Sequence, residues 1–337
     1  MRPVTLKDIA QKLNISRSTV SKALSGRSDV SKKTREKVLI LAKELNYVPN
    51  LTAVNLRTQR TKTIGVIVPS IRNQFFSKVI IGVIEEAEKH GYLVIILQSN
   101  ERVDLEEKQL QLLMEKQVDG ILISLSNQTN RFNHINVVIK NEIPVVLFDK
   151  INKLLDCSKV IIDDQQAAYK VVTHLIEKGY RRIAHFRGPL NPQNSIDRFL
   201  GYKKALLDHD IEFDASLVYV CDNNDDFNDG YSNAQKLLKN NSKADAVFAV
   251  TDVVAVGVLK YFKEKSIKIP NDIAVFGFSN WFMSSVVNPS LSTVKQPDIE
   301  MGEIAATLLI KEIESKNPII SHETVVLPTS LIIRESS

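Results

Sequence analysis

The sequence predicts a small all-α domain followed by an α/β body of two doubly wound parallel-sheet subdomains. Apolar positions within residues 1–48 recur at the spacing of three short helices. From residue 63 onward, apolar strands alternate with helices of about ten to twenty residues, which is typical of βαβ units. The charge divides at nearly the same place, because residues 1–60 carry a net charge of +9 and the rest of the chain carries −4.

Length and cysteine content predict a chain that folds without disulfides. Its 337 residues are enough for two or three domains. Cys157 and Cys221 lie far apart and form neither a disulfide framework nor a CxxC metal or redox site. No apolar run approaches the ~18 residues of a membrane span, and none follows the basic N-terminus. We therefore expect a cytoplasmic protein.

Each of the three N-terminal helices has a start signal. Thr5 and Asp8 predict a capping box for the first helix. Ser16 is placed to cap a second helix over residues 17–24, and the third helix begins near Ser31. Two helices across a short turn match a helix-turn-helix, in which the second helix enters the major groove of DNA N-terminus first.

This interpretation assigns DNA contacts to particular side chains. Arg17, Ser18 and Lys22 project from the first turns of the second helix, where base edges are read. Helical hairpins also occur in proteins that never touch DNA, but the clustered positive charge favours a partner that carries phosphates. Hydroxyl groups that can reach those phosphates belong to Thr5, Ser16, Thr19, Ser21 and Ser31.

Four segments carry a family resemblance: VTLKDIA at residues 4–10, SRSTVSKAL at 16–24, VSKKTR at 30–35 and LNYVPN at 45–50. They resemble the DNA-binding headpiece of the lactose/galactose repressor family of bacterial transcriptional regulators. The resemblance implies three partners, namely a double-stranded DNA operator, a small-molecule effector and a second copy of the chain. It implies no membrane partner.

The resemblance also implies a headpiece over residues 1–48 and a hinge over residues 49–61 that becomes helical on the operator. In the family, a hinge leucine wedges into the minor groove, and Ala53 and Leu56 fall at the matching positions. Val54 stands where the family often has arginine, but an apolar wedge needs only Leu56 and a two-fold partner. A plain flexible linker is the alternative for this segment.

The body contains two series of predicted strands, and a Gly-Tyr pair at residues 91–92 is echoed at residues 179–180. The resemblance continues to Arg334 and implies a periplasmic-binding-protein-like fold in which the chain crosses between subdomains three times. We place the crossings near Lys159, Pro289 and Ser321. The two subdomains then comprise residues 62–159 with 290–320 and residues 160–289 with 321–337. The strands are expected at residues 64–68, 93–97, 120–123 and 145–148, then 160–162, 182–186, 217–220, 246–250 and 273–276.

Ligands of doubly wound folds bind beyond the carboxyl ends of the strands, so the residues that follow strands are the effector candidates. The family uses these positions and an arginine in an Arg-x-x-Gly-Tyr segment, which matches Arg198. Phe76 could instead pack in the core, and Asp149 or Asp252 could cap a helix. Ser279 stands where sugar-responsive members frequently carry aspartate. The predicted effector residues are Asn73, Phe75, Phe76, Asp149, Arg198, Asp252, Ser279 and Trp281.

Enzymatic signatures are not apparent. The sequence holds no GxGxxG after a strand and no GxxxxGK[ST], and GFSNW at residues 277–281 fails the GxSxG pattern at its last position. The six histidines stand singly, outside metal-ligand spacing. We therefore expect no catalysis, metal or cofactor.

The leading interpretation is a ligand-responsive DNA-binding regulator: a dimeric repressor of carbohydrate-use genes with a palindromic operator and a sugar-like effector. A solute-binding receptor without DNA function and a hydrolase with remote catalytic residues are the alternatives.

Overall fold

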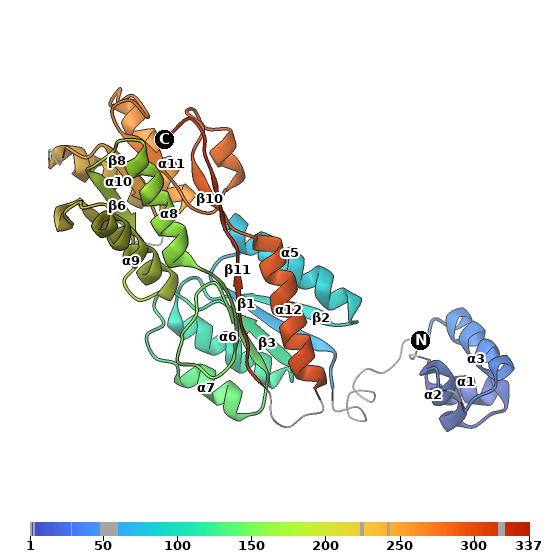
Figure 1. Cartoon of the computed structure of the whole chain (residues 1–337). Helices are drawn as coiled ribbons and strands as arrows, with labels where there is room; N and C mark the ends of the chain where they lie inside the picture. Colours follow the sequence, from blue (N-terminus) through green and yellow to red (C-terminus); the bar gives the residue numbers. More distant parts are fainter. Residues whose placement is uncertain are drawn as a thin grey trace. The chain divides into compact units, whose positions relative to one another are not determined.

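The computed structural model describes residues 2, 4–27, 29–47, 60–222, 226–240, 243–315 and 321–337. The chain forms two compact units, Met1–Thr61 and Lys62–Ser337 (Figure 1). The second unit begins where the receptor body was expected to begin. Most of the expected hinge, including Ala53 and Leu56, lies outside the described residues. No helix in the described ranges is long and apolar enough to cross a membrane.

Three helices form the described part of the first unit. Ile9, Val20 and Val38 contribute one fully buried side chain from each helix, and smaller or partly buried residues pack around them. The helix-turn-helix is therefore held by its own small core. The helices are α1 (Leu6–Leu13), α2 (Arg17–Leu24) and α3 (Lys32–Glu44).

The start signals expected from the sequence are confirmed in these three helices. Thr5 and Asp8 form the capping box of α1, and the Ser16 and Ser31 side chains accept backbone N–H groups at the starts of α2 and α3. The turn after α1 passes through Asn14, whose φ of 51° is a left-handed conformation that asparagine tolerates well. Caps and turn together fix where α2 begins.

A six-stranded parallel sheet forms the first half of the body, with strand order β11-β5-β4-β3-β1-β2. In Figure 1, α5 (Gln74–Lys89) and α12 (Asp298–Glu314) lie side by side against this sheet. The opposite face carries α6 (Val103–Glu115) and α7 (Asn133–Lys140). The strands are β1 (Thr63–Val68), β2 (Leu93–Gln98), β3 (Gly120–Ile123), β4 (Val145–Phe148), β5 (Ser158–Ile162) and β11 (Thr324–Leu327).

A four-stranded parallel sheet of order β7-β6-β8-β9 forms the second half, and an antiparallel β10-β12 pair adjoins it. Helices α8 and α9 pack together on one face, and α10 and α11 pack together on the other. The elements are β6 (Ile183–Arg187), β7 (Val218–Val220), β8 (Ala246–Ala249), β9 (Ala274–Phe276), β10 (Thr293–Lys295), β12 (Ser330–Ile332), α8 (Asp164–Glu177), α9 (Gln193–Asp208), α10 (Asp226–Lys239), α11 (Asp252–Glu264), and the short 3₁₀ turns η1 (Ala215–Leu217) and η2 (Phe282–Ser285).

The Gly-Tyr pair that occurs in both halves of the body ends a helix in each of them. Gly91 and Gly179 both adopt positive φ after a helix, at 71° and 101°. The tyrosine that follows each glycine then donates its backbone N–H to a carbonyl of the last helical turn, from Tyr92 to Ala87 and from Tyr180 to Leu175. Each subdomain thus ends the first helix of its series in the same way.

The expected crossings near Lys159, Pro289 and Ser321 are each a few residues too early. β5 continues the first sheet beside β4, so residues 160–162 do not start the second subdomain. Residues 290–295 stay with the second sheet, because Ser292 bridges to Phe276 of β9. β11 returns to the first sheet beside β5. Each crossing segment first pairs with a strand of one sheet and then leaves that sheet. Because the paired segments are remote in the sequence, no short sequence pattern predicts the pairing.

Candidate functional site

Helix α2 separates a buried face from an exposed polar face. Val20 and Ala23 are buried, whereas Arg17 and Ser18 in the first turn and Lys22 in the last turn are exposed. The three predicted base-reading residues therefore share one accessible surface. Lys22 forms an ion pair with Asp29 at 2.6 Å, and both side chains remain about half exposed.

The predicted phosphate contacts differ in what their hydroxyl groups already do. Both the backbone N–H and the hydroxyl of Thr5 donate to Asp8, each at 2.8 Å, so the donors of Thr5 are engaged. Ser16 and Ser31 act as helix caps and lie exposed. Thr19 lies within 2.8 Å of the Ser16 hydroxyl, and Ser21 is half-buried. The hydroxyls of Ser16, Thr19 and Ser31 also bond to neighbouring hydroxyls, so the phosphate contacts stay a prediction.

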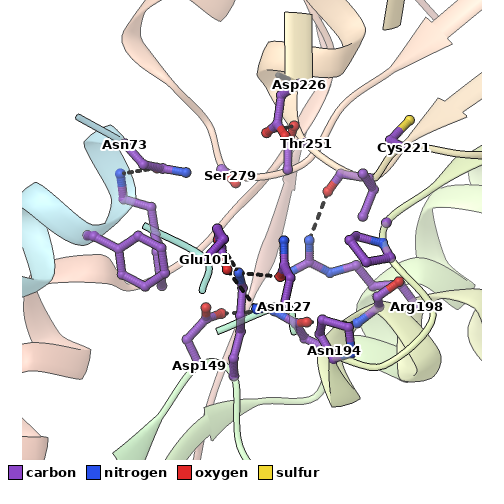
Figure 2. Close-up of a pocket in the computed structure, with 18 of the residues that line it drawn as sticks. Asn73, Glu101, Asn127, Asp149, Asn194, Arg198, Cys221, Asp226, Thr251 and Ser279 are labelled. Atoms are coloured by element: carbon purple, nitrogen blue, oxygen red, sulfur yellow. Dashed lines mark hydrogen bonds and ion pairs between the residues drawn. The ribbon is translucent and has the colours of Figure 1, made fainter. Parts of the chain in front are cut away.

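A cavity that is partly open to solvent lies where strands of both halves of the body end. Figure 2 shows Asp226 and Thr251 on the side of this cavity opposite Asp149. Six of the eight predicted effector residues line it: Asn73, Phe75, Phe76, Asp149, Arg198 and Ser279. Asp252 and Trp281 line an adjoining groove that shares Asn73, Phe75 and Ser279 with the cavity.

The Arg-x-x-Gly-Tyr segment has a structural explanation in α9. Gly201 lets α9 approach α8 so closely that a Cβ there would lie 2.1 Å from the carbonyl oxygen of Gln165. One turn away, Arg198 Nε donates to Asp164 at 2.7 Å, and Nη1 donates to the Val250 carbonyl at 2.8 Å. The Tyr202 hydroxyl on the same face reaches the Ile183 carbonyl at 2.9 Å. The segment therefore joins two helices and fixes Arg198 at the cavity wall.

Arg198 is 4 % exposed, and its guanidinium also lies 3.6 Å from the centre of the Phe278 ring. An arginine held by an ion pair, a carbonyl and a ring loses little conformational entropy when it meets a ligand. Arg198 is thus both part of the fold and preorganised for binding.

Two cavity residues have positive φ angles, which residues other than glycine rarely adopt. Asp149 has φ of 56° and Ser279 has φ of 122°. Such conformations cluster at ligand sites, where the surrounding structure maintains them. Asp149 is 8 % exposed; burial raises the pKa of its carboxyl group, and Lys150 and Arg198 oppose that rise.

The aromatic pair at the start of α5 lies between cavity and core. Phe75 and Phe76 are 7 % and 4 % exposed, and their ring centres are 5.2 Å apart. Phe76 also contacts Phe148 of β4 edge to face. Both interpretations of Phe76, as core residue and as cavity wall, therefore apply.

Asp252 is engaged by the fold. Its Oδ2 accepts hydrogen bonds from the Trp281 backbone N–H at 2.6 Å and the Ser284 hydroxyl at 2.7 Å, and its Oδ1 accepts from Thr293 at 2.5 Å. It holds the segment after β9 against the start of α11. It lines the adjoining groove rather than the cavity, and the ligand role expected for it stays a prediction.

Several residues that line the cavity were not predicted from the sequence. Most of them follow strands, as the predicted effector residues also do. Lys150 Nζ contacts Glu101 and Asn127, each at 2.6 Å, and Glu101 also accepts the Asn127 backbone N–H at 2.8 Å. This triad joins the loops after β2, β3 and β4. The other missed polar residues include Asn194, Ser195, Asp222, Asp226 and Gln296.

Comparisons with known proteins show which family has this sequence and architecture. The profile "Bacterial regulatory proteins, lacI family" matches residues 5–50, and "Periplasmic binding proteins and sugar binding domain of LacI family" matches residues 61–333. Catabolite control protein A of Priestia megaterium is 33% identical, with 99% of each chain covered. The Ribose operon repressor of Haemophilus influenzae is 33% identical, with 98% of each chain covered.

Solved structures of transcriptional regulators are similar to this chain over its whole length. A complex of the transcriptional regulator CelR with cellobiose is 28% identical, with a TM-score of 0.76 and all of both chains covered. A Lac repressor bound to ONPG is 26% identical, with a TM-score of 0.86 and all of both chains covered. The chain therefore belongs to the LacI family of bacterial regulatory proteins and is a DNA-binding transcriptional regulator.

Proposed function

We propose that this regulator is a repressor of carbohydrate-use genes that binds a palindromic operator as a homodimer and releases or grips it in response to a sugar-like effector. One observation carries the DNA half of the proposal: Arg17, Ser18 and Lys22 lie exposed on one side of a short capped helix whose other face is buried. The named relatives and ligand-bound structures support the carbohydrate half, because a ribose operon repressor and a cellobiose complex are among them.

The proposal includes a cytoplasmic location and no catalytic step. A regulator that binds chromosomal DNA works where that DNA is. The described residues that line the cavity include no histidine, and the two lining cations are engaged in ion pairs with Glu101 and Asp164. This wall is suited to holding a polar ligand.

Regulation then follows from the position of the cavity. A ligand that contacts Asp149 on one side and Asp226 on the other favours a particular arrangement of the two subdomains. In a dimer, that arrangement sets the spacing of the two headpieces and whether paired hinges can insert Leu56. The effector needs no contact with DNA, only different affinities for the two arrangements.

Arg17→Ala tests base reading. An operator selected from random palindromic duplexes is titrated with the full-length chain, by fluorescence anisotropy, against operators changed at one base pair at a time. We expect the variant to lose about 1–3 kcal/mol of binding free energy and its preference at one base position. Uniform weakening on every duplex would make Arg17 a phosphate contact instead, and no selection of a palindrome by the native chain would overturn the proposed function.

Leu56→Ala tests the hinge. Loss of the apolar wedge should lower operator affinity by about tenfold or more, because the minor groove then opens without a side chain to fill the step. Effector affinity of the DNA-free protein, measured by calorimetry, should stay unchanged. Normal operator binding by this variant would make the segment a linker.

A further inference from the structure

The effector cavity contains more carboxylates than cations. Glu101, Asp149 and Asp226 line its inner wall, and Asp222 lies exposed at its rim. Lys150 and Arg198 are the Lys and Arg side chains among the described lining residues. Arg198 is already neutralised by Asp164 behind the wall, at 2.7 Å.

Lys150 also forms an ion pair with a lining carboxylate. Its Nζ lies 2.6 Å from Glu101, which leaves Asp149 and Asp226 without an ion-pair partner among the described residues. Their hydrogen-bond partners are neutral: Asn194 Nδ2 donates to Asp149 at 3.3 Å, and the Thr251 hydroxyl donates to Asp226 at 3.1 Å. The cavity wall therefore carries two carboxylates, one on each side, that form no direct ion pair among the described residues.

These two carboxylates are costly in the empty cavity. Burial raises the pKa of both Asp149 and Asp226, Lys150 and a hydrogen bond to each carboxylate oppose that rise, and Glu101 adds to it. A further positive charge near them would reduce that cost. Among the described residues, no group of three His, Cys, Asp or Glu side chains could hold a metal ion.

Two further groups show that the cavity is built for a polar ligand. Ser195 is 3 % exposed and Gln296 is 4 % exposed, and both line the cavity. In the described part of the chain, Ser195 Oγ and Gln296 Oε1 are buried without a hydrogen-bond partner. Buried polar atoms are normally satisfied, so these two atoms are available to the polar groups of a ligand. The edges of Phe75 and Phe76 supply an apolar surface beside them.

We propose that the effector is an amino sugar, whose protonated amine is attracted by the carboxylates of Asp149 and Asp226 while its hydroxyl groups meet Ser195, Gln296 and Arg198. This inference rests on the proposed function and narrows its effector from sugars in general to cationic ones. A neutral sugar would leave both carboxylates without a direct ion pair, and a sugar phosphate would add negative charge to a wall that is already negative.

Calorimetry on the full-length protein tests the inference with matched ligands. The panel contains D-glucose, D-galactose and D-ribose, the derivatives in which each hydroxyl in turn is replaced by an amine, the N-acetylated forms of those amines, and the sugar phosphates. We expect at least one amine to bind about tenfold or more tightly than its parent sugar, and its N-acetylated form to lose that advantage. A parent sugar, an N-acetylated form or a phosphate that binds as tightly as the best amine would overturn the proposal, as would a panel without any binding amine.

Isosteric variants locate the charge. Asp149→Asn and Asp226→Asn preserve side-chain volume and should each abolish most of the preference for the amine over its parent sugar. Asp197→Asn is the matched control, because it removes one charge beside Arg198 from a residue that does not line the cavity. An unchanged preference in both cavity variants would overturn the proposal. Operator affinity without effector is measured for every variant, so a misfolded protein is recognised, and failure of the amine preference is distinguished from failure of DNA binding.

Discussion

In the headpiece, Arg17 and Ser18 stand exposed on one short helix, whereas in the receptor body Arg198 is 4 % exposed and bonded to Asp164 and Val250 from two other segments. The first surface awaits a large polyanion that brings its own charge. The second must hold a small ligand whose water is stripped away, so its charges are fixed before the ligand arrives.

This difference determines how a substitution should act in each region. An exposed headpiece side chain can be removed at little cost to folding, so its loss reports on DNA binding. A cavity side chain such as Arg198 supports its own wall, so its loss mixes binding with stability. Effects on ligand binding and effects on stability must therefore be measured separately.

Arg198→Ala should have the largest effect, and the effect should be on folding. Removing the guanidinium leaves Asp164, which is 7 % exposed, as a buried carboxylate without its cation. We expect the free energy of unfolding of the body to fall by about 3–5 kcal/mol, measured by urea denaturation. Arg17→Ala is the headpiece counterpart and should leave stability nearly unchanged.

The double variant Arg198→Ala, Asp164→Ala provides the control. It removes both charges of the ion pair, so it should recover part of the stability lost in the single variant. Equal losses in both would show that packing around Phe278, rather than the unpaired carboxylate, causes the effect. Arg198→Ala alone is consequently a poor probe of effector binding, which the Asp149→Asn and Asp226→Asn pair avoids.

The sequence predicted the headpiece more completely than the cleft because headpiece signals are local. Thr5, Ser16 and Ser31 each cap a helix whose first residue follows directly. The pairing of β5 with β11 joins residues about half the chain apart, and no short segment announces it. Likewise, Glu101 and Lys150 meet only because parallel strands end at the same edge of a sheet.

His185 should make the body, but not the headpiece, sensitive to mild acid. Its ring is fully buried and stacked near Phe199, Tyr202 and Phe248, and burial lowers its pKa to about 3. Between pH 6.5 and 3 the unfolded chain binds a proton at this residue that the folded chain does not, so its contribution to stability falls as pH falls. Residues 1–60 contain no histidine.

We expect this residue to cost up to about 2 kcal/mol of unfolding free energy between pH 7 and pH 5. Asp164 acts in the opposite direction, because burial raises its pKa to about 7 and the folded state then binds the extra proton. The measurement is therefore the difference between native protein and His185→Gln, by urea denaturation at each pH. The glutamine variant should lose less stability on acidification, and parallel pH curves would contradict the assignment.

The smallest effect belongs to the exposed ion pair of the headpiece. Lys22 lies 2.6 Å from Asp29, with both side chains about half exposed, so the pair contributes little to folding. It nevertheless occupies a proposed base-reading cation and places a carboxylate beside the DNA surface. Asp29→Asn should leave the headpiece folded and tighten operator binding a few-fold at low salt, because the lysine no longer has to leave an anion to reach the groove.

Salt dependence shows whether the released lysine causes this gain. If Lys22 then meets a phosphate, the slope of log affinity against log salt concentration should steepen by up to about 0.9. If Lys22 meets a base edge, the gain should persist mainly on the selected operator and vanish on duplexes changed at one position. Glu36→Gln removes the same charge from the exposed surface of α3 without releasing Lys22, so it measures the effect of net charge alone. Equal tightening by both variants would assign the gain to net charge and remove the Lys22–Asp29 pair from the account of DNA recognition.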